Sequence, residues 1–162
     1  MDNDQATSPA ELSFIYQSEV RTLVEQFHKE ALKAWEQGLY IATVVLSGAV
    51  LEGLLTFALT TRQPEAQQKF REKYGKKADD RPLPRDWYLT ELIDIAHSMN
   101  LVGESAKDGA WAVKDFRNLI HPCKLLDRSR PRWRALATAA LAAIEDISAS
   151  LAGRLASQGS QP

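Results

Sequence analysis

Hydrophobic residues recur every three or four positions along most of this chain, a spacing that predicts amphipathic helices rather than strands. The first stretch follows Ser8 and Pro9, which have the form of an N-cap and a first helical position, and it ends at Gly38. We therefore expect a first helix of about seven turns. Its predicted buried stripe comprises Leu12, Tyr16, Val20, Leu23, Phe27, Ala31 and Ala34.

Residues 39–61 form a second stretch, in which apolar residues cover nearly every side of the predicted helix. Glu52 is its only charged residue, and small residues such as Gly48 and Gly53 allow other helices to approach closely. The length and composition approach those of a membrane span. A carboxylate deep in a bilayer costs several kcal/mol, so we interpret this stretch as the buried central helix and expect no membrane contact.

The middle of the chain predicts two shorter helices separated by a loop. Pro64 opens and Gly75 closes the first, which carries Phe70 and Tyr74 four residues apart, and a loop is expected over residues 76–85. The second helix is expected to start with Thr90 as its N-cap and to end near residue 103.

Two further helices are expected after residue 104. One starts around Ser105 and must end before Pro122, because the proline ring cannot donate the helical hydrogen bond, and the last begins near Arg132. The chain is therefore predicted to be an all-α, single-domain bundle of about five or six helices. We assign residues 9–156 to this domain and expect residues 1–8 and 157–162 to be disordered tails.

Charge is distributed unevenly along the chain, although the net charge is only -1. Residues 1–61 carry 3 basic and 8 acidic side chains, whereas residues 62–134 carry 16 basic and 11 acidic side chains. Only the middle of the chain is thus expected to face a polyanion. The single cysteine, Cys123, excludes an intramolecular disulfide, and we expect a cytoplasmic protein with no metal or cofactor, because no cluster of ligands has metal-binding spacing.

The most informative motif is Arg117-Asn118-Leu119-Ile120-His121-Pro122. Arg117 and His121 are four residues apart, so their side chains leave a helix about 40° apart, on the same face. A histidine can transfer protons near neutral pH, and the arginine fork binds phosphate. Together with Asn118, which could orient the imidazole, these residues form a candidate catalytic site for cleavage of RNA without a metal.

A basic run follows the motif and strengthens the RNA hypothesis. Between residues 124 and 134 the net charge is +4, with a tryptophan between the arginines. Cations beside an aromatic side chain are typical of surfaces that bind single-stranded RNA. The candidate RNA-binding residues are Lys124, Arg128, Arg130, Arg132, Trp133 and Arg134.

Arg117-Asn118 followed by His121-Pro122 late in the chain, with the small-residue helix around residues 47–55 before it, resembles the HEPN superfamily. The resemblance implies an up-and-down all-α domain, commonly a homodimer, and in many members a metal-independent endoribonuclease of toxin or defence systems. It also implies an antitoxin or other protein partner. Only Asn118, Leu119 and Ile120 separate Arg117 from His121, one residue fewer than in the nuclease motif, which shifts the histidine by about 100° around the helix.

A structural interpretation of the same residues stays open. Arg117 can pair with Glu52, because a buried carboxylate needs a cationic or hydrogen-bonding partner, and His121 can bond the carbonyls at a helix end. The chain would then be a non-catalytic, homodimeric HEPN-like interaction module. The other histidines, His28 and His97, are expected at the surface or at the edge of the core.

Overall fold

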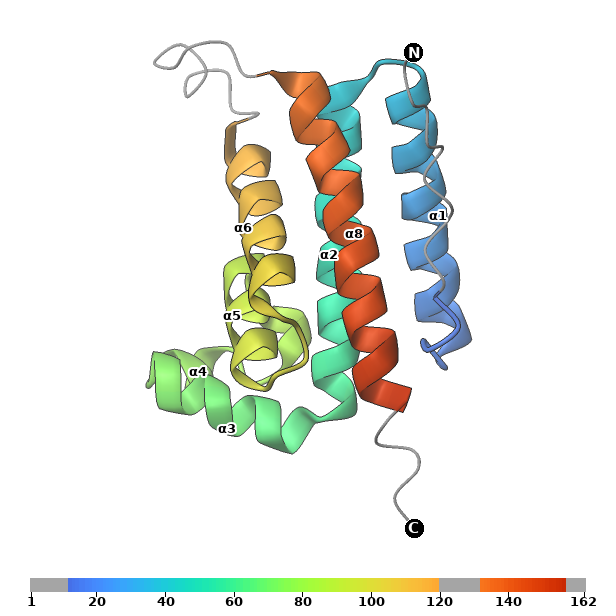
Figure 1. Ribbon diagram of the computed structural model, residues 1–162. Helices are drawn as coiled ribbons and strands as arrows, with labels where there is room; N and C mark the ends of the chain where they lie inside the picture. The colour runs from blue at the N-terminus through green and yellow to red at the C-terminus, as the bar shows by residue number, and fades with distance from the viewer. Residues whose placement is uncertain (1–11, 120–131, 157–162) are drawn as a thin grey trace.

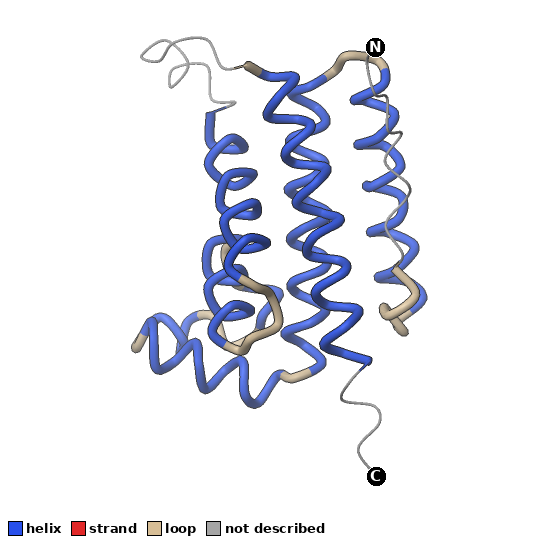
Figure 2. Tube along the Cα trace, in the orientation of Figure 1, coloured by secondary structure: helices blue, strands red, loops and turns tan. Residues whose placement is uncertain are grey.

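The computed structural model describes residues 12–119 and 132–156, and within residues 116–119 it describes the backbone only. Helices make up almost all of this part of the chain, and no strand occurs in it (Figure 2). The predicted all-α bundle is therefore confirmed. Four long helices run side by side: α1 (Ser18–Glu36), α2 (Tyr40–Thr61), α6 (Glu104–Leu119) and α8 (Trp133–Ala156) (Figure 1).

Helix α2 lies at the centre of the bundle, as its apolar composition predicted. It packs against α1, α8, α5 and α6, and its buried side chains include Val44, Leu51, Leu54 and Leu55. Both α2 and α8 are long and apolar enough to cross a membrane by length and composition, but 56% of the relevant α2 window is buried inside the bundle. The apolar residues of α2 thus form the core of the helical domain.

Smaller elements cover one end and one side of the bundle. Helix α3 (Gln63–Tyr74) lies across the end of α2, and α4 (Lys77–Asp80) and a 3-10 turn, η1 (Pro84–Asp86), lead to α5 (Leu89–Ser98) (Figure 1). Gly75 closes α3 with a φ of 59°, as predicted. The expected loop over residues 76–85 contains α4, whose Ala78 is buried. The prediction of a loop throughout this segment was therefore wrong, and the turn of helix packs Ala78 into the core.

Helix α1 begins later than the sequence predicted. Ser8 and Pro9 lie outside the described residues, and residues 12–17 are not helical. Leu12 and Ile15 are both buried through a turn in which the Ile15 N–H donates to the Leu12 carbonyl, whereas Tyr16 is 69% exposed. The helical spacing of Leu12, Tyr16 and Val20 was thus misleading, because this segment packs into the core with a different set of side chains.

The buried face of α1 also differs from the predicted stripe. Val24, His28, Ala31 and Ala34 are buried, whereas Leu23 is 52% exposed. The prediction of His28 at the surface or core edge was wrong, because His28 lies on the buried face of α1, one turn from Val24 and from Ala31. Gly38, with a φ of 72°, ends α1 as predicted.

The helix expected to start at Thr90 was predicted to end near residue 103, which was wrong, because α5 ends at Ser98. Helix α6 begins at Glu104, close to the expected start around Ser105. Tyr88, not Thr90, caps α5, because the Glu91 carboxylate accepts the Tyr88 backbone N–H. Helix α5 ends at Ser98, and Asn100, with a φ of 55°, turns the chain into α6. Helix α8 buries Ala140, Ile144, Ile147 and Leu151, as its spacing predicted.

Candidate functional site

Helix α6, which carries Arg117, ends at the same end of the bundle at which α8 begins. Helix α6 runs towards this end and stops at Leu119 in the described part, and α8 starts there at Trp133 and runs back (Figure 1). The α1–α2 turn lies at the same end. Because α6 and α8 also pack against each other, the last described turn of α6 and the first turn of α8 are close in the fold.

Several predicted site residues lie partly or wholly outside the described residues. For Arg117 and Asn118 the backbone is described, on the last turn of α6, but the side chains are not. The others that lie outside the description are His121, Lys124, Arg128 and Arg130. The catalytic geometry thus stays a prediction, and the structure gives the position of the helix that carries it.

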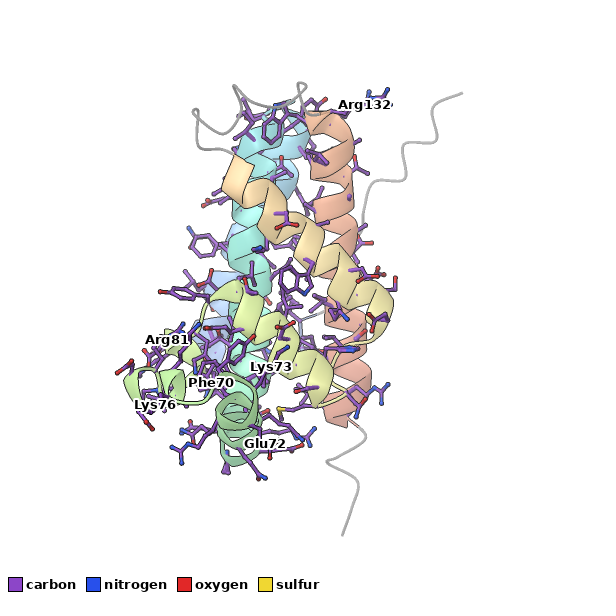
Figure 3. All side chains as sticks on the ribbon, turned by 90° about the vertical axis from the view of Figure 1, so that its left-hand side faces the viewer. Phe70, Glu72, Lys73, Lys76, Arg81 and Arg132 are labelled. Atoms are coloured by element: carbon purple, nitrogen blue, oxygen red, sulfur yellow. The ribbon has the colours of Figure 1, made fainter. Side chains whose placement is uncertain are left out.

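The start of α8 has the properties of an anion-binding surface. Arg132 and Arg134 are exposed and Trp133 is half-buried, and Arg132 projects at this end of the bundle (Figure 3). The first turn of α8 contains no acidic residue. Backbone N–H groups at a helix N-terminus carry a partial positive charge, which adds to that of the two arginines.

Trp35 fixes the start of α8 relative to α1. Its indole Nε1 donates a hydrogen bond to Thr138 Oγ1 at 3.3 Å, and the Thr138 hydroxyl in turn donates to the Arg134 carbonyl at 3.0 Å. These bonds connect the end of α1 to the first turns of α8. The backbone that carries Arg134 is therefore held by tertiary contacts.

A line of basic and aromatic side chains on α6 leads towards the motif, and sequence reasoning missed it. Lys107, Trp111 and Lys114 follow each other at spacings of four and three, and Asn118 continues the line. The Lys114 ammonium lies 4.7 Å from the centre of the Trp111 ring and 2.9 Å from the Asp115 carboxylate. The spacing alone was the signal that could have found this line.

Glu52 and Arg117 lie on helices that pack together. Glu52 is half-buried on α2, and α2 packs against α6. On α6 the residues Ala106, Ala110 and Val113 are buried, and position 117 follows Val113 by one turn, in the register of this buried face. The register therefore agrees with the structural interpretation of Arg117 as well as with a site at the helix end.

A separate polar network joins α3, α5 and α6 on the side of the bundle. Asp94 accepts hydrogen bonds from Tyr74 Oη at 2.8 Å and from Lys73 Nζ at 2.7 Å. Burial, together with the bond to Asp94, raises the pKa of Tyr74, so the phenol stays protonated. Nearby, His97 Nε2 lies 3.0 Å from Glu104 Oε2. His97 is half-buried, at the edge of the core as expected.

Several hollows occur in the described part of the chain, and the linings of two of them contain no predicted site residue. One, of about 490 Å³, is lined by residues of α3, including Phe70, by Ala78 of α4, and by Pro82 and Trp87, which lie on either side of η1. The other, of about 540 Å³, lies between the segment before α1 and the C-terminal ends of α2 and α8. In the described residues no group of three or more histidine, cysteine or carboxylate side chains is placed to hold a metal ion.

Comparisons of the chain with family models, with curated proteins and with solved structures gave no match.

Proposed function

We propose that this chain is an RNA-binding helical domain, HEPN-like in its motif, that contacts single-stranded RNA at the end of the bundle formed by α6 and α8. The proposal rests on one observation: two segments that are distant in sequence lie at the same end of the bundle. The last described turn of α6, which carries Arg117, lies at the same end of the bundle as Arg132 and the first turn of α8 with Trp133 and Arg134. Two exposed arginines, a half-buried tryptophan and a helix N-terminus offer both charge and an aromatic surface to one RNA strand.

The motif adds a chemical step to this binding surface. A base removes the proton from the RNA 2'-hydroxyl, the oxygen attacks the adjacent phosphorus, and an acid protonates the leaving 5'-oxygen. In the proposal His121 transfers a proton, Arg117 stabilises the charge on the phosphorane, and Asn118 orients the imidazole. One histidine does not serve as acid and base at the same time, so a second copy of the chain in a homodimer supplies the other group.

Cleavage is tested by incubating the full chain with single-stranded RNA in EDTA. The wild type should cut the RNA, and His121→Ala should abolish cutting while circular dichroism shows an unchanged helical content. Intact RNA after long incubation at high protein concentration would contradict the catalytic part of the proposal.

RNA binding is tested separately with an arginine at each end of α8. Arg134→Ala should weaken binding to all RNA sequences and reduce the slope of log K against log salt by about one. Arg154→Ala, in the last turn of the same helix, removes the same charge at the opposite end and should leave affinity and slope unchanged. Equal effects of the two variants would exclude the start of α8 as the binding surface.

A non-catalytic interaction module is the second candidate, and the register of position 117 with the buried face of α6 favours it. In that case Arg117 pairs with Glu52 and stabilises the helix packing. Arg117→Ala should then lower the melting temperature or dissociate the dimer, and the wild type should not bind RNA at physiological salt. Calorimetry and analytical ultracentrifugation of the variant distinguish the two candidates.

A further inference from the structure

Tyr88 is an exposed aromatic residue that is nevertheless firmly positioned. Its side chain is 68% exposed, although its backbone N–H donates to Glu91 Oε2 at 2.8 Å at the start of α5. The guanidinium carbon of Arg81 lies 4.3 Å from the centre of the Tyr88 ring. A cation thus stacks on the ring, while most of the side chain remains accessible to solvent.

The contacts of Arg81 prevent its guanidinium from leaving the ring. It makes two hydrogen bonds to the Glu91 carboxylate, at 2.5 and 2.7 Å, and the Arg81 and Glu91 side chains are only 19% and 6% exposed. The Arg81 carbonyl accepts a hydrogen bond from Trp87 Nε1 at 2.8 Å. Trp87 is itself stacked on Phe70, with ring centres 4.1 Å apart. Figure 3 shows Arg81 and Phe70 in the same lobe, beside α5.

We propose that Tyr88, supported by Arg81, is a stacking platform for a nucleobase of the bound RNA strand. The inference rests on the proposed RNA-binding function and adds a contact outside the predicted motif. Each nucleobase has a π face, and an ordered aromatic ring accepts it with little loss of conformational entropy. The guanidinium draws electron density towards one face of the phenol, so the opposite face favours an electron-rich base.

The charges around Tyr88 indicate stacking rather than phosphate attraction. Arg81 is neutralised by Glu91 in the bidentate pair. The other charged residues between positions 76 and 86 are exposed, and those of opposite sign are equal in number: Lys76, Lys77 and Arg85 against Asp79, Asp80 and Asp86. Because these charges cancel, this surface offers a strand an aromatic contact and no excess of cations.

The platform lies where a strand leaving the end of the bundle can reach it. Helices α5 and α6 pack against each other and are joined by a short turn, so they run antiparallel. Helix α5 has 10 residues and is about 15 Å long. Its N-terminus is therefore level with the middle of α6, where Trp111 and Lys114 lie. An RNA strand that passes from the motif along α6 meets Tyr88 on the adjacent helix.

The test measures binding of the full chain to a short RNA that carries 2'-O-methyl groups, which prevent cleavage, and one 2-aminopurine. Tyr88→Ala should weaken binding by about 5- to 150-fold, the range for one stacked base. The slope of log K against log salt should stay the same, because no phosphate contact is lost. Tyr88→Trp should bind like the wild type, and only proteins with an aromatic residue at position 88 should quench the 2-aminopurine through stacking.

Tyr16 provides a matched control, because it is another tyrosine of 69% exposure and it packs edge-on against Phe57. Tyr16→Ala should leave RNA affinity unchanged. Two outcomes would refute the stacking role of Tyr88 if the wild type binds RNA: Tyr88→Ala binds equally well, or it loses affinity together with a reduced salt slope. In either case the proposed RNA-binding function stands. If the wild type does not bind RNA at physiological salt, both proposals fail.

Discussion

Replacement of Arg81 by methionine is expected to destabilise the chain substantially, because it leaves the Glu91 carboxylate buried without its cation. Glu91 is only 5% exposed. The substitution removes both hydrogen bonds from the guanidinium to its carboxylate and leaves the hydrogen bond from the Tyr88 backbone N–H. Methionine is unbranched and flexible, as the arginine stem is, so packing around the stem changes little. The main effect is therefore an unpaired buried charge.

The size of the effect follows from the burial of the pair. Removing one partner of a buried ion pair costs about 3–5 kcal/mol. Arg81 keeps 19% of its side-chain surface exposed, so water partly solvates the site and we expect a loss near the lower end, about 3 kcal/mol. For a domain of this length that loss corresponds to a fall in melting temperature of about 6–12 °C.

Urea unfolding followed by circular dichroism measures the loss, and a double-mutant cycle tests its cause. Glu91→Met in the Arg81→Met background removes the unpaired charge, so the double variant should recover much of the lost stability. Arg81→Lys keeps the charge without the bidentate geometry and should be destabilised by an intermediate amount. A loss below about 1 kcal/mol for Arg81→Met, or a double variant as unstable as the sum of the single variants, would refute the reasoning.

Two further predictions concern the packing of α1. A Cβ atom at Gly53 would lie 2.8 Å from Val24 Cγ2, so Gly53→Ala should lower the free energy of unfolding by about 1–3 kcal/mol. Gly153→Ala, with no neighbour within 4 Å of the added atom, should be neutral or slightly stabilising, and equal urea midpoints for the two variants would contradict the prediction. Burial lowers the pKa of His28 in the folded state below its value in the unfolded chain. As the pH falls, the histidine of the unfolded chain is therefore protonated at a higher pH than that of the folded chain. The resulting stability is complete above about pH 6.5 and is lost as the pH falls through the folded-state pKa, a loss that urea titrations should show for the wild type and not for His28→Leu.

The sequence predicted most of the helices because their signals are local. Gly38 and Gly75 mark helix ends through positive φ angles, and the apolar content of residues 40–61 required a central position. These features depend on backbone conformation and on the number of apolar side chains, both of which can be read from adjacent residues.

The start of α1 was not predictable in the same way. Leu12 and Ile15 are three residues apart, which fits a helix, but both are buried by a turn that tertiary contacts stabilise. The burial of His28 likewise depends on which face of α1 packs against the other helices. The burial of the Glu91 carboxylate also depends on a tertiary contact, its ion pair with Arg81. Arg81 lies ten residues earlier, in a segment expected to be a loop.

The sequence by itself determined the helical class, the central position of α2 and the candidate motif of Arg117 and His121, because periodicity and residue chemistry are local properties. Tertiary structure alone decided which distant segments meet. It placed the end of α6 beside the start of α8, and it stacked Arg81 on Tyr88 through a bidentate pair with Glu91. Such contacts depend on helix directions and on the geometry of packing, and the spacing of residues along the chain does not specify them.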